Sequence, residues 1–181
     1  MILASQSPRR KEILQNAGFE FVVHSPCIEE VRLPGEAPVD YVRRLAALKA
    51  DAVDAMNGDI ILSADTVVVL DQHVLEKPSD AADAERMLRL LSGREHEVVT
   101  GICLKSATRR IVDSETTRVR FVALSAREIL HYAHSGEPMD KAGGYAIQGL
   151  ASKYIDRVEG CYFNVVGLPI SLVYRHWKEF V

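Results

Sequence analysis

Short apolar runs alternate with amphipathic stretches along this chain. Strands are predicted at residues 1–4, 19–24, 60–62, 67–70, 96–103 and 111–124, where apolar and β-branched side chains cluster or alternate. Helices are predicted at residues 11–18, 39–57, 79–93, 125–132 and from residue 170, where apolar side chains recur three and four positions apart. The alternation runs on without an internal repeat, a low-complexity tract or a linker.

Ser79 or Asp80 is expected to cap helix 79–93, and Ser125 with Glu128 is expected to form a capping box for helix 125–132. Three of the predicted helices have a readable inner face, which in helix 79–93 consists of Ala84, Met87, Leu88 and Leu91. The stripe of helix 39–57, which Gly58 closes, consists of Tyr41, Leu45, Leu48, Ala52 and Met56. Lys49 lies at the edge of this stripe, where a lysine usually extends along apolar surface to water but could also reach into a cleft. In the C-terminal helix the expected inward side chains are Ile170, Val173, Trp177 and Phe180.

Composition narrows the class of protein. A chain of 181 residues with 48% hydrophobic and 26% charged residues is typical of one soluble globular domain. No apolar run has the length of a membrane span, and no signal-peptide pattern is present, so we expect a cytoplasmic protein without a membrane partner. Three scattered cysteines fit a reducing compartment and argue against a structural zinc site. A net charge of −3 argues against stable nucleic-acid binding, so any basic site must be local.

The first stretch whose side chains could take part in binding or catalysis is residues 5–10, between the first strand and the first helix. Ser7 is a candidate N-cap and Pro8 a candidate first helical residue. The turn would then direct backbone N–H groups, two hydroxyls and the Arg9 and Arg10 guanidinium groups to one point, which suits a phosphate chain. The alternative is an ordinary capped helix with surface arginines.

Two later stretches add candidate groups. Asp65 falls between two buried apolar runs, and Glu76 and Lys77 follow at the end of the predicted hairpin around residues 71–73. The alternative for Asp65 is a turn or cap carboxylate. Residues 140–149 contain three glycines but fit neither phosphate-binding glycine motif. His131 and His134 are three residues apart, but without a further Cys or His nearby we expect ordinary surface or core residues.

Eight short motifs, in this order, resemble the Maf family of nucleoside triphosphate pyrophosphatases. The resemblance runs from residue 3 to about residue 170 and rests on residues 5–10, 64–66, 76–78, 92–93, 100–101, 140–143, 147–149 and 165–169. It implies an α/β fold: a single domain, residues 1–181, with a long mixed β-sheet flanked by helices and a cleft between two lobes, similar to the inosine triphosphatase fold. It also implies cleavage of a nucleoside triphosphate to the monophosphate and pyrophosphate with a divalent cation, Mg²⁺ or Mn²⁺.

The resemblance also implies roles for single residues. Asp65 would accept the proton of the attacking water, and Glu30 and Asp65 would lie near the metal. Ser5, Arg9, Arg10, Lys49 and Lys77 would bind the phosphate chain. Arg9, Thr66 and Gln148 match the branch that acts on dTTP and UTP, whereas the 7-methyl-GTP branch has Gln and Glu at the last two positions. Gln6 departs from the family's glycine, at a loop position where we expect little effect.

Two alternatives stay open at this point. One is a phosphatase that removes only the γ-phosphate, because the same cationic site would serve it. The other is a non-enzymatic nucleotide-sensing regulator of septum formation, which would need the cationic residues but not Asp65. The sequence also leaves open whether the protein is a homodimer, which nucleotide it prefers, and which metal it uses.

Overall fold

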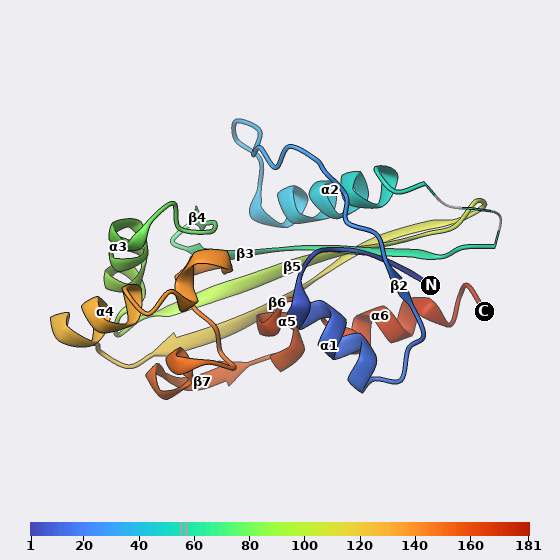
Figure 1. The fold of residues 1–181 in the computed structure, drawn as a ribbon. Helices are drawn as coiled ribbons and strands as arrows, with labels where there is room; N and C mark the ends of the chain where they lie inside the picture. Colours follow the sequence, from blue (N-terminus) through green and yellow to red (C-terminus); the bar gives the residue numbers. More distant parts are fainter. Residues whose placement is uncertain (55, 57) are drawn as a thin grey trace. The chain divides into compact units, whose positions relative to one another are not determined.

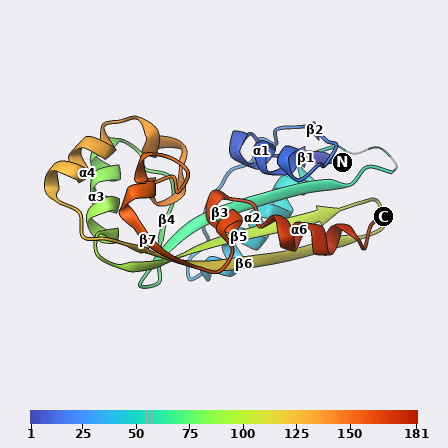
Figure 2. The same ribbon diagram turned by 90° about the horizontal axis from the view of Figure 1, so that it is seen from below.

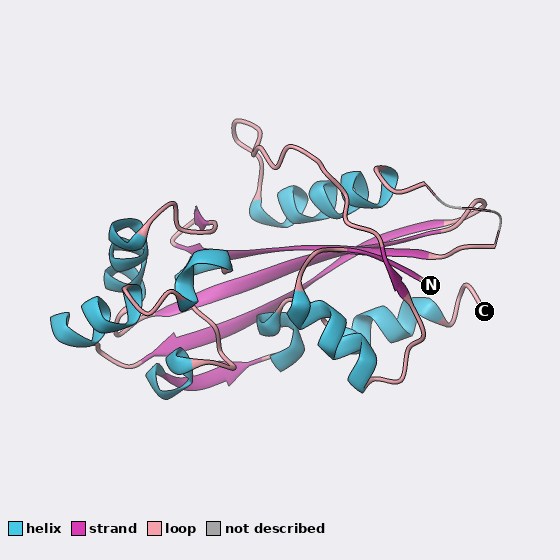
Figure 3. Ribbon diagram, viewed as in Figure 1, coloured by secondary structure: helices cyan, strands magenta, loops and turns pink. Residues whose placement is uncertain are grey.

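The computed structural model describes residues 1–181 except 55 and 57 (Figure 1). The strands are β1 (Ile2–Ala4), β2 (Val22–Val23), β3 (Ile61–Leu70), β4 (His73–Leu75), β5 (Glu95–Lys105), β6 (Arg110–Phe121) and β7 (Ile155–Glu159). The α-helices are α1 (Pro8–Asn16), α2 (Pro38–Asp51), α3 (Ala81–Leu91), α4 (Ala126–Ala133), α5 (Tyr162–Val166) and α6 (Ile170–Trp177). Three short 3₁₀ helices, η1 (Glu137–Asp140), η2 (Ala142–Gly144) and η3 (Leu150–Tyr154), complete the α/β arrangement drawn in Figure 3.

The strands form one mixed sheet of seven strands in the order β2-β1-β3-β5-β6-β7, with β4 paired to β3. β1 is parallel to both β2 and β3, and Ala4 is the partner of Ser63. β4 and β7 pair antiparallel with β3 and β6. The predicted mixed α/β sheet is therefore confirmed. The register also places the end of β1, and with it the Ser5 turn, close to the segment of β3 that follows Ser63.

By their internal contacts the residues group into two compact units. Unit 1 comprises residues 1–66, 100–115 and 163–181, and unit 2 comprises residues 67–99 and 116–162. Strands β3, β5 and β6 each contribute residues to both units. The predicted single domain and the predicted cleft stay predictions.

In unit 1, helices pack on both faces of the strands. α2 lies on one face, and α1 and α6 lie on the other (Figures 1 and 2). α2 approaches β5 closely at Gly101, where a Cβ would overlap the backbone of Val42. The contact brings α2 down onto a cluster of small and branched side chains: Ile2, Ala4, Ala46, Ala50, Val53, Ile61 and Cys103.

The structure corrects the predicted helix at 39–57. α2 ends at Asp51, so the prediction extended the helix too far. Of the residues predicted as its last turn, 55 and 57 lie outside the described part of the chain. The predicted inner residues Tyr41 and Leu45 are buried, together with Val42, Ala46, Lys49 and Ala50. The predicted inner residues Leu48, Ala52 and Met56 are exposed. The face is rotated because Ala46 and Ala50 pack against the sheet and Lys49 points inward.

In unit 2, α3 packs on α4 with the predicted residues Ala84, Met87, Leu88 and Leu91 buried. In the same unit His96 is buried on β5, and its Nε2 lies 2.8 Å from the Tyr145 hydroxyl. The rings of His96, Tyr145 and Phe121 contact one another edge to face. Burial lowers the pKa of His96 to about 4, so this histidine is neutral at physiological pH.

The predicted N-caps at Ser7 and Ser125 are confirmed, and of the two candidates Ser79 and Asp80 it is Asp80 that caps α3. The side chain of each cap accepts a hydrogen bond from the first turn of its helix. Two other predictions were wrong in extent. The strand at 19–24 shrinks to Val22 and Val23, both exposed, and of the four inward residues of the C-terminal helix only Val173 is fully buried. Among the described residues, no helix combines the length and apolarity that a membrane crossing requires.

Candidate active site

The turn that follows β1 is closed by two serine hydroxyls. Ser5 Oγ accepts a hydrogen bond from the Ser7 amide at 3.2 Å, and Ser7 Oγ accepts one from the Arg10 amide at 3.4 Å. Pro8 has no N–H to offer. Two of the amides that the sequence assigned to an anion are therefore already paired inside the turn. The side chains, rather than the backbone, become the main candidates for phosphate contacts.

Arg10 connects three segments that are far apart in the sequence. Its Nε donates to the Gly167 carbonyl at 2.8 Å, and its Nη1 donates to the Ala64 carbonyl at 2.8 Å and to Ser5 Oγ at 3.2 Å. Its Nη2 donates to Thr66 Oγ1 at 3.1 Å. These contacts use four of the five N–H groups of a guanidinium. Arg10 therefore holds the Ser5 turn against β3 and has little donor capacity left for a ligand.

Asp65 lies in the interior of β3, which runs unbroken through the segment predicted as two separate strands, 60–62 and 67–70. The alternative of a turn or cap carboxylate is therefore wrong. Its carboxylate is buried and accepts a hydrogen bond from Lys49 Nζ at 2.6 Å. Burial raises the pKa of the Asp65 carboxyl, while the Lys49 and Arg10 cations act in the opposite direction. A buried carboxylate whose proton affinity is raised is suited to accept a proton.

Glu30 reaches the same lysine from the loop before α2. Its Oε1 lies 2.8 Å from Lys49 Nζ, and its side chain stays 41% exposed, so it is accessible to a ligand. Two carboxylates thus share one ammonium group. Carboxylate oxygens are also the donors that Mg²⁺ and Mn²⁺ prefer, so Glu30 and Asp65 are the candidate ligands for such an ion. The described residues contain no group of three or more His, Cys, Asp or Glu side chains arranged to hold a metal.

Thr66, the neighbour of Asp65, belongs to a chain of hydroxyl contacts. Its Oγ1 lies 2.9 Å from Thr100 Oγ1, and Thr100 donates to the Asn164 carbonyl at 3.1 Å. The structure therefore brings together Ser5, Arg10 and Thr66 as one group and Glu30, Lys49 and Asp65 as another, both joined to the middle of β3. Arg9 is half-buried in the first turn of α1, beside Arg10.

Lys77 and Gln148 belong to unit 2, and both side chains are exposed. The turn after β4, which carries Lys77, is tied to the glycine-rich stretch by a 2.9 Å hydrogen bond from the Gly143 amide to the Glu76 carbonyl. Gly143 also packs directly on Val68, where an added Cβ would meet the valine side chain at 2.7 Å. Within unit 2, these contacts fix the Lys77 turn to the segment that leads to Gln148.

Sequence reasoning missed the acceptors of Arg10, because backbone carbonyls such as those of Ala64 and Gly167 leave no mark on residue identity. It also missed Tyr132 and Glu137, which hold the Gln148 segment. The only sequence signal for Glu137 was its position just before the glycine-rich stretch.

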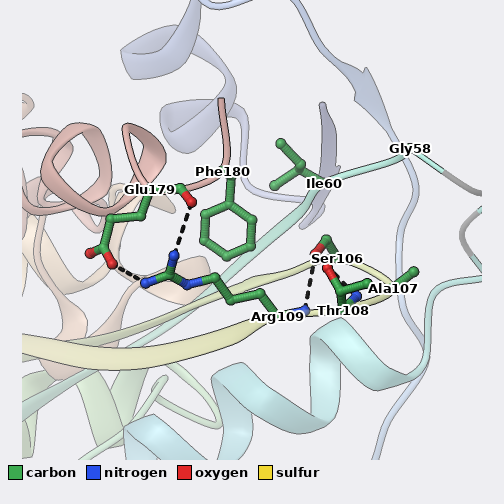
Figure 4. A pocket seen from close by; sticks show the side chains of 8 residues that line it. All are labelled: Gly58, Ile60, Ser106, Ala107, Thr108, Arg109, Glu179 and Phe180. Atoms are coloured by element: carbon green, nitrogen blue, oxygen red, sulfur yellow. Dashed lines mark hydrogen bonds and ion pairs between the residues drawn. The ribbon is translucent and has the colours of Figure 1, made fainter.

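A separate pocket of about 410 Å³ in unit 1 contains none of the predicted site residues (Figure 4). In that pocket Arg109 donates to the Glu179 carbonyl at 3.0 Å, and its guanidinium lies 5.7 Å from the centre of the Phe180 ring.

The chain matches one protein family over nearly its whole length. A family model described as "Maf-like protein" matches residues 1–180, and the chain belongs to that family. A dTTP/UTP pyrophosphatase of Koribacter versatilis is 54% identical over 180 residues, covering 99% of this chain and 93% of that protein. One from Symbiobacterium thermophilum is 50% identical over 181 residues, with coverage of 99% and 93%. The Staphylococcus aureus Ham1 protein shares the fold, with a TM-score of 0.56 at 15% identity and coverage of 98% and 97%.

Proposed function

We propose that this protein is a nucleoside triphosphate pyrophosphatase that hydrolyses dTTP and UTP to the monophosphate and pyrophosphate. The names of relatives that are about half identical over nearly the whole chain support the substrate class. The observation that supports hydrolysis is the Asp65 carboxylate, which is buried in the middle of β3 and accepts a hydrogen bond from Lys49 of α2. Pyrimidine nucleotides carrying modified bases are further candidate substrates.

Asp65 is the proposed general base. Its carboxylate takes a proton from water as the water oxygen bonds to phosphorus, the α–β phosphoanhydride bond breaks, and the bonding electrons leave with pyrophosphate. Lys49 Nζ holds the Asp65 carboxylate in place through a 2.6 Å hydrogen bond. Its positive charge is proposed to stabilise the negative charge of the phosphate chain. Arg9 and Ser5 are the other proposed phosphate ligands of unit 1. Arg10 belongs to this set through its charge, and its contacts assign it mainly to positioning Ser5 and Thr66.

The proposed cofactor is a divalent cation, Mg²⁺ or Mn²⁺, held by Glu30 and Asp65 together with substrate phosphate oxygens. When bound, such an ion offsets phosphate charge and makes water easier to deprotonate. The shared contact of both carboxylates with Lys49 supports this assignment, because it shows that they converge on one cation.

Two residues of unit 2 complete the proposal. Lys77 is proposed to bind the phosphate chain, and Gln148 to bind the base. A primary amide offers a donor and an acceptor, and uracil and thymine present an N3–H donor between two carbonyl acceptors. One glutamine can therefore satisfy two adjacent groups of either base.

Asp65 also distinguishes this proposal from a non-enzymatic sensor of nucleotides. A group that deprotonates water is needed only by a protein that hydrolyses its nucleotide, so a protein that only binds nucleotides would not need Asp65 in this role. A net charge of −3 and the free thiols Cys27, Cys103 and Cys161 support the further proposals of a cytoplasmic location and no stable nucleic-acid partner.

Product analysis tests the reaction. The purified protein is incubated with UTP or dTTP and Mg²⁺, and nucleotides and phosphates are separated by ion-exchange chromatography. We expect monophosphate and pyrophosphate in equal amounts, and neither from the variant Asp65→Asn over the same period. Diphosphate and free phosphate would show a γ-phosphatase instead. Nucleotide binding without any turnover would support the sensor.

A further inference from the structure

Gln148 is carried by a short loop whose two ends are held by one pair of side chains. At the first end, the Ala146 amide donates to the Tyr132 hydroxyl at 3.1 Å. At the other end, the Leu150 amide donates to Glu137 Oε2 at 3.0 Å. Tyr132 and Glu137 are joined to each other, because the Tyr132 hydroxyl donates to Glu137 Oε1 at 2.7 Å. The loop from Ala146 to Leu150 is therefore closed by a continuous hydrogen-bonded bridge.

The bridge stands on a rigid base within unit 2. Tyr132 is only 1% exposed, lies on the buried face of α4, and packs edge to face on Tyr154 with 6.0 Å between ring centres. Glu137 is set by the turn after α4, where Ser135 Oγ donates to the Tyr132 carbonyl at 2.7 Å and accepts from the Glu137 amide at 3.2 Å. Lys141 Nζ donates to the Glu137 carbonyl at 2.6 Å. Both members of the bridge therefore have little freedom to move.

The loop itself is shaped to meet the carboxylate. The Gly149 amide donates to the Ala146 carbonyl at 3.1 Å, which closes a tight turn around residues 147 and 148. A Cβ at Gly149 would overlap the Glu137 carboxylate, so only glycine allows this approach. The Gln148 side chain is meanwhile exposed. The bridge thus orders the backbone on either side of an exposed side chain that the fold does not otherwise bury.

We propose that Tyr132 and Glu137 are positioning residues for base selection, which hold the Gln148 amide in the orientation that recognises a pyrimidine edge. This inference rests on the proposed function and goes beyond it, because neither residue is assigned to the substrate. An amide can pair with two adjacent groups of a base only if its plane is fixed, and an ordered loop lowers the entropy that binding must remove. The bridge provides that order.

The test compares base preference between isosteric variants. Tyr132→Phe removes the hydroxyl that accepts from Ala146 and donates to Glu137, and keeps the ring. We expect kcat/KM for UTP and dTTP to fall about fivefold or more, mainly through KM, because a buried polar group left unpaired shifts an equilibrium by at least that factor. GTP, held through its phosphates, is expected to lose less than about twofold. Tyr154→Phe is the matched control, since it removes a hydroxyl from the neighbouring ring and leaves the bridge intact.

Two further variants separate positioning from folding. Glu137→Gln places a donor where the bridge needs an acceptor, and Gly149→Ala forces the carboxylate away from the loop. Both variants are expected to lower the ratio of kcat/KM for UTP to kcat/KM for GTP. A cooperative melting transition would show that each variant is folded. In a Gln148→Ala background, Tyr132→Phe is expected to leave this ratio unchanged.

The failures of the two proposals are distinguishable. If the wild-type protein releases no pyrophosphate from UTP, the proposed function fails. If it does, and the folded variants keep the wild-type UTP-to-GTP ratio or lose activity equally toward all nucleotides, the positioning role is wrong. If Tyr132→Phe does not fold, Glu137→Gln decides by the same ratio.

Discussion

The substitution Asp65→Asn tests the assignment that matters most for the chemistry. Asparagine has almost the same shape as aspartate, and its Oδ1 can keep the hydrogen bond that Lys49 Nζ makes at 2.6 Å. Lys49 also keeps its ion pair with Glu30 at 2.8 Å, so the lysine is not left as an unpaired buried cation. Because burial raises the pKa of the Asp65 carboxyl, its charged form is disfavoured at this position, and we expect no loss of melting temperature.

The expected loss therefore falls on the reaction. Removal of a general base typically lowers a rate by about 10²- to 10⁴-fold, and we expect a decrease of that order in kcat for UTP. In the absence of a divalent cation, nucleotide affinity is expected to stay the same or to improve, because one negative charge beside the phosphate chain is gone. Initial rates of pyrophosphate release at saturating UTP with Mg²⁺ give kcat, and calorimetric titration with UTP without Mg²⁺ gives the affinity.

A matched control comes from Asp113 on β6, also in unit 1. Its carboxylate pairs with Arg43 at 3.4 Å and with His176 at 2.8 Å. Neither partner is a proposed site residue. Asp113→Asn is expected to keep kcat within about twofold. An Asp65→Asn variant that retains more than about a tenth of the wild-type kcat would refute the role of Asp65 as the base.

Three further predictions concern other parts of the molecule. Lys77→Ala is expected to lower the turnover of all triphosphates alike and to leave the melting temperature unchanged. Arg10→Ala is expected to lower the turnover and the melting temperature, because it breaks four hydrogen bonds. Calorimetry and kinetics with four nucleotides distinguish the two variants. Gln148→Glu is expected to lower kcat/KM for UTP and dTTP by about 5- to 150-fold, with a smaller loss for GTP, because an anionic oxygen replaces the amide donor; a uniform loss would contradict base selection by Gln148. Protonation of His96 opposes folding, since burial lowers its pKa in the folded protein to about 4 from the ordinary histidine value of 6.5. The free energy of unfolding should therefore fall by about 2 kcal/mol from about pH 7.5 to about pH 5, and His96→Gln, measured by urea denaturation, should remove that part of the decrease.

Features that depend on neighbouring residues could be predicted from the sequence. The helix caps at Ser7, Asp80 and Ser125 were, because a cap is a contact between residues three positions apart. So was the hairpin at Asp71 and Gln72, where both residues adopt positive φ angles of 48° and 71°. The buried face of α3 followed from its spacing alone.

Features decided by distant contacts could not. The spacing of helix 39–57 placed its stripe on Leu48, but packing against the sheet at Gly101 turned the helix so that Lys49 faces inward. Asp65 was expected between two runs, but in the structure one strand, β3, runs from Ile61 to Leu70 between β1 and β5 and includes it.

The candidate site divides in the same way. The residue types of Ser5, Arg10 and Asp65 suggested phosphate chemistry, because hydroxyl, guanidinium and carboxylate groups carry that information in their identity. Which of them holds the others in place was decided by the tertiary structure. Arg10 donates to the carbonyl of Gly167, which lies 157 positions away in the sequence, and a backbone carbonyl has the same chemistry at every residue. The sequence therefore determined which chemical groups are present, and the fold determined which of them meet.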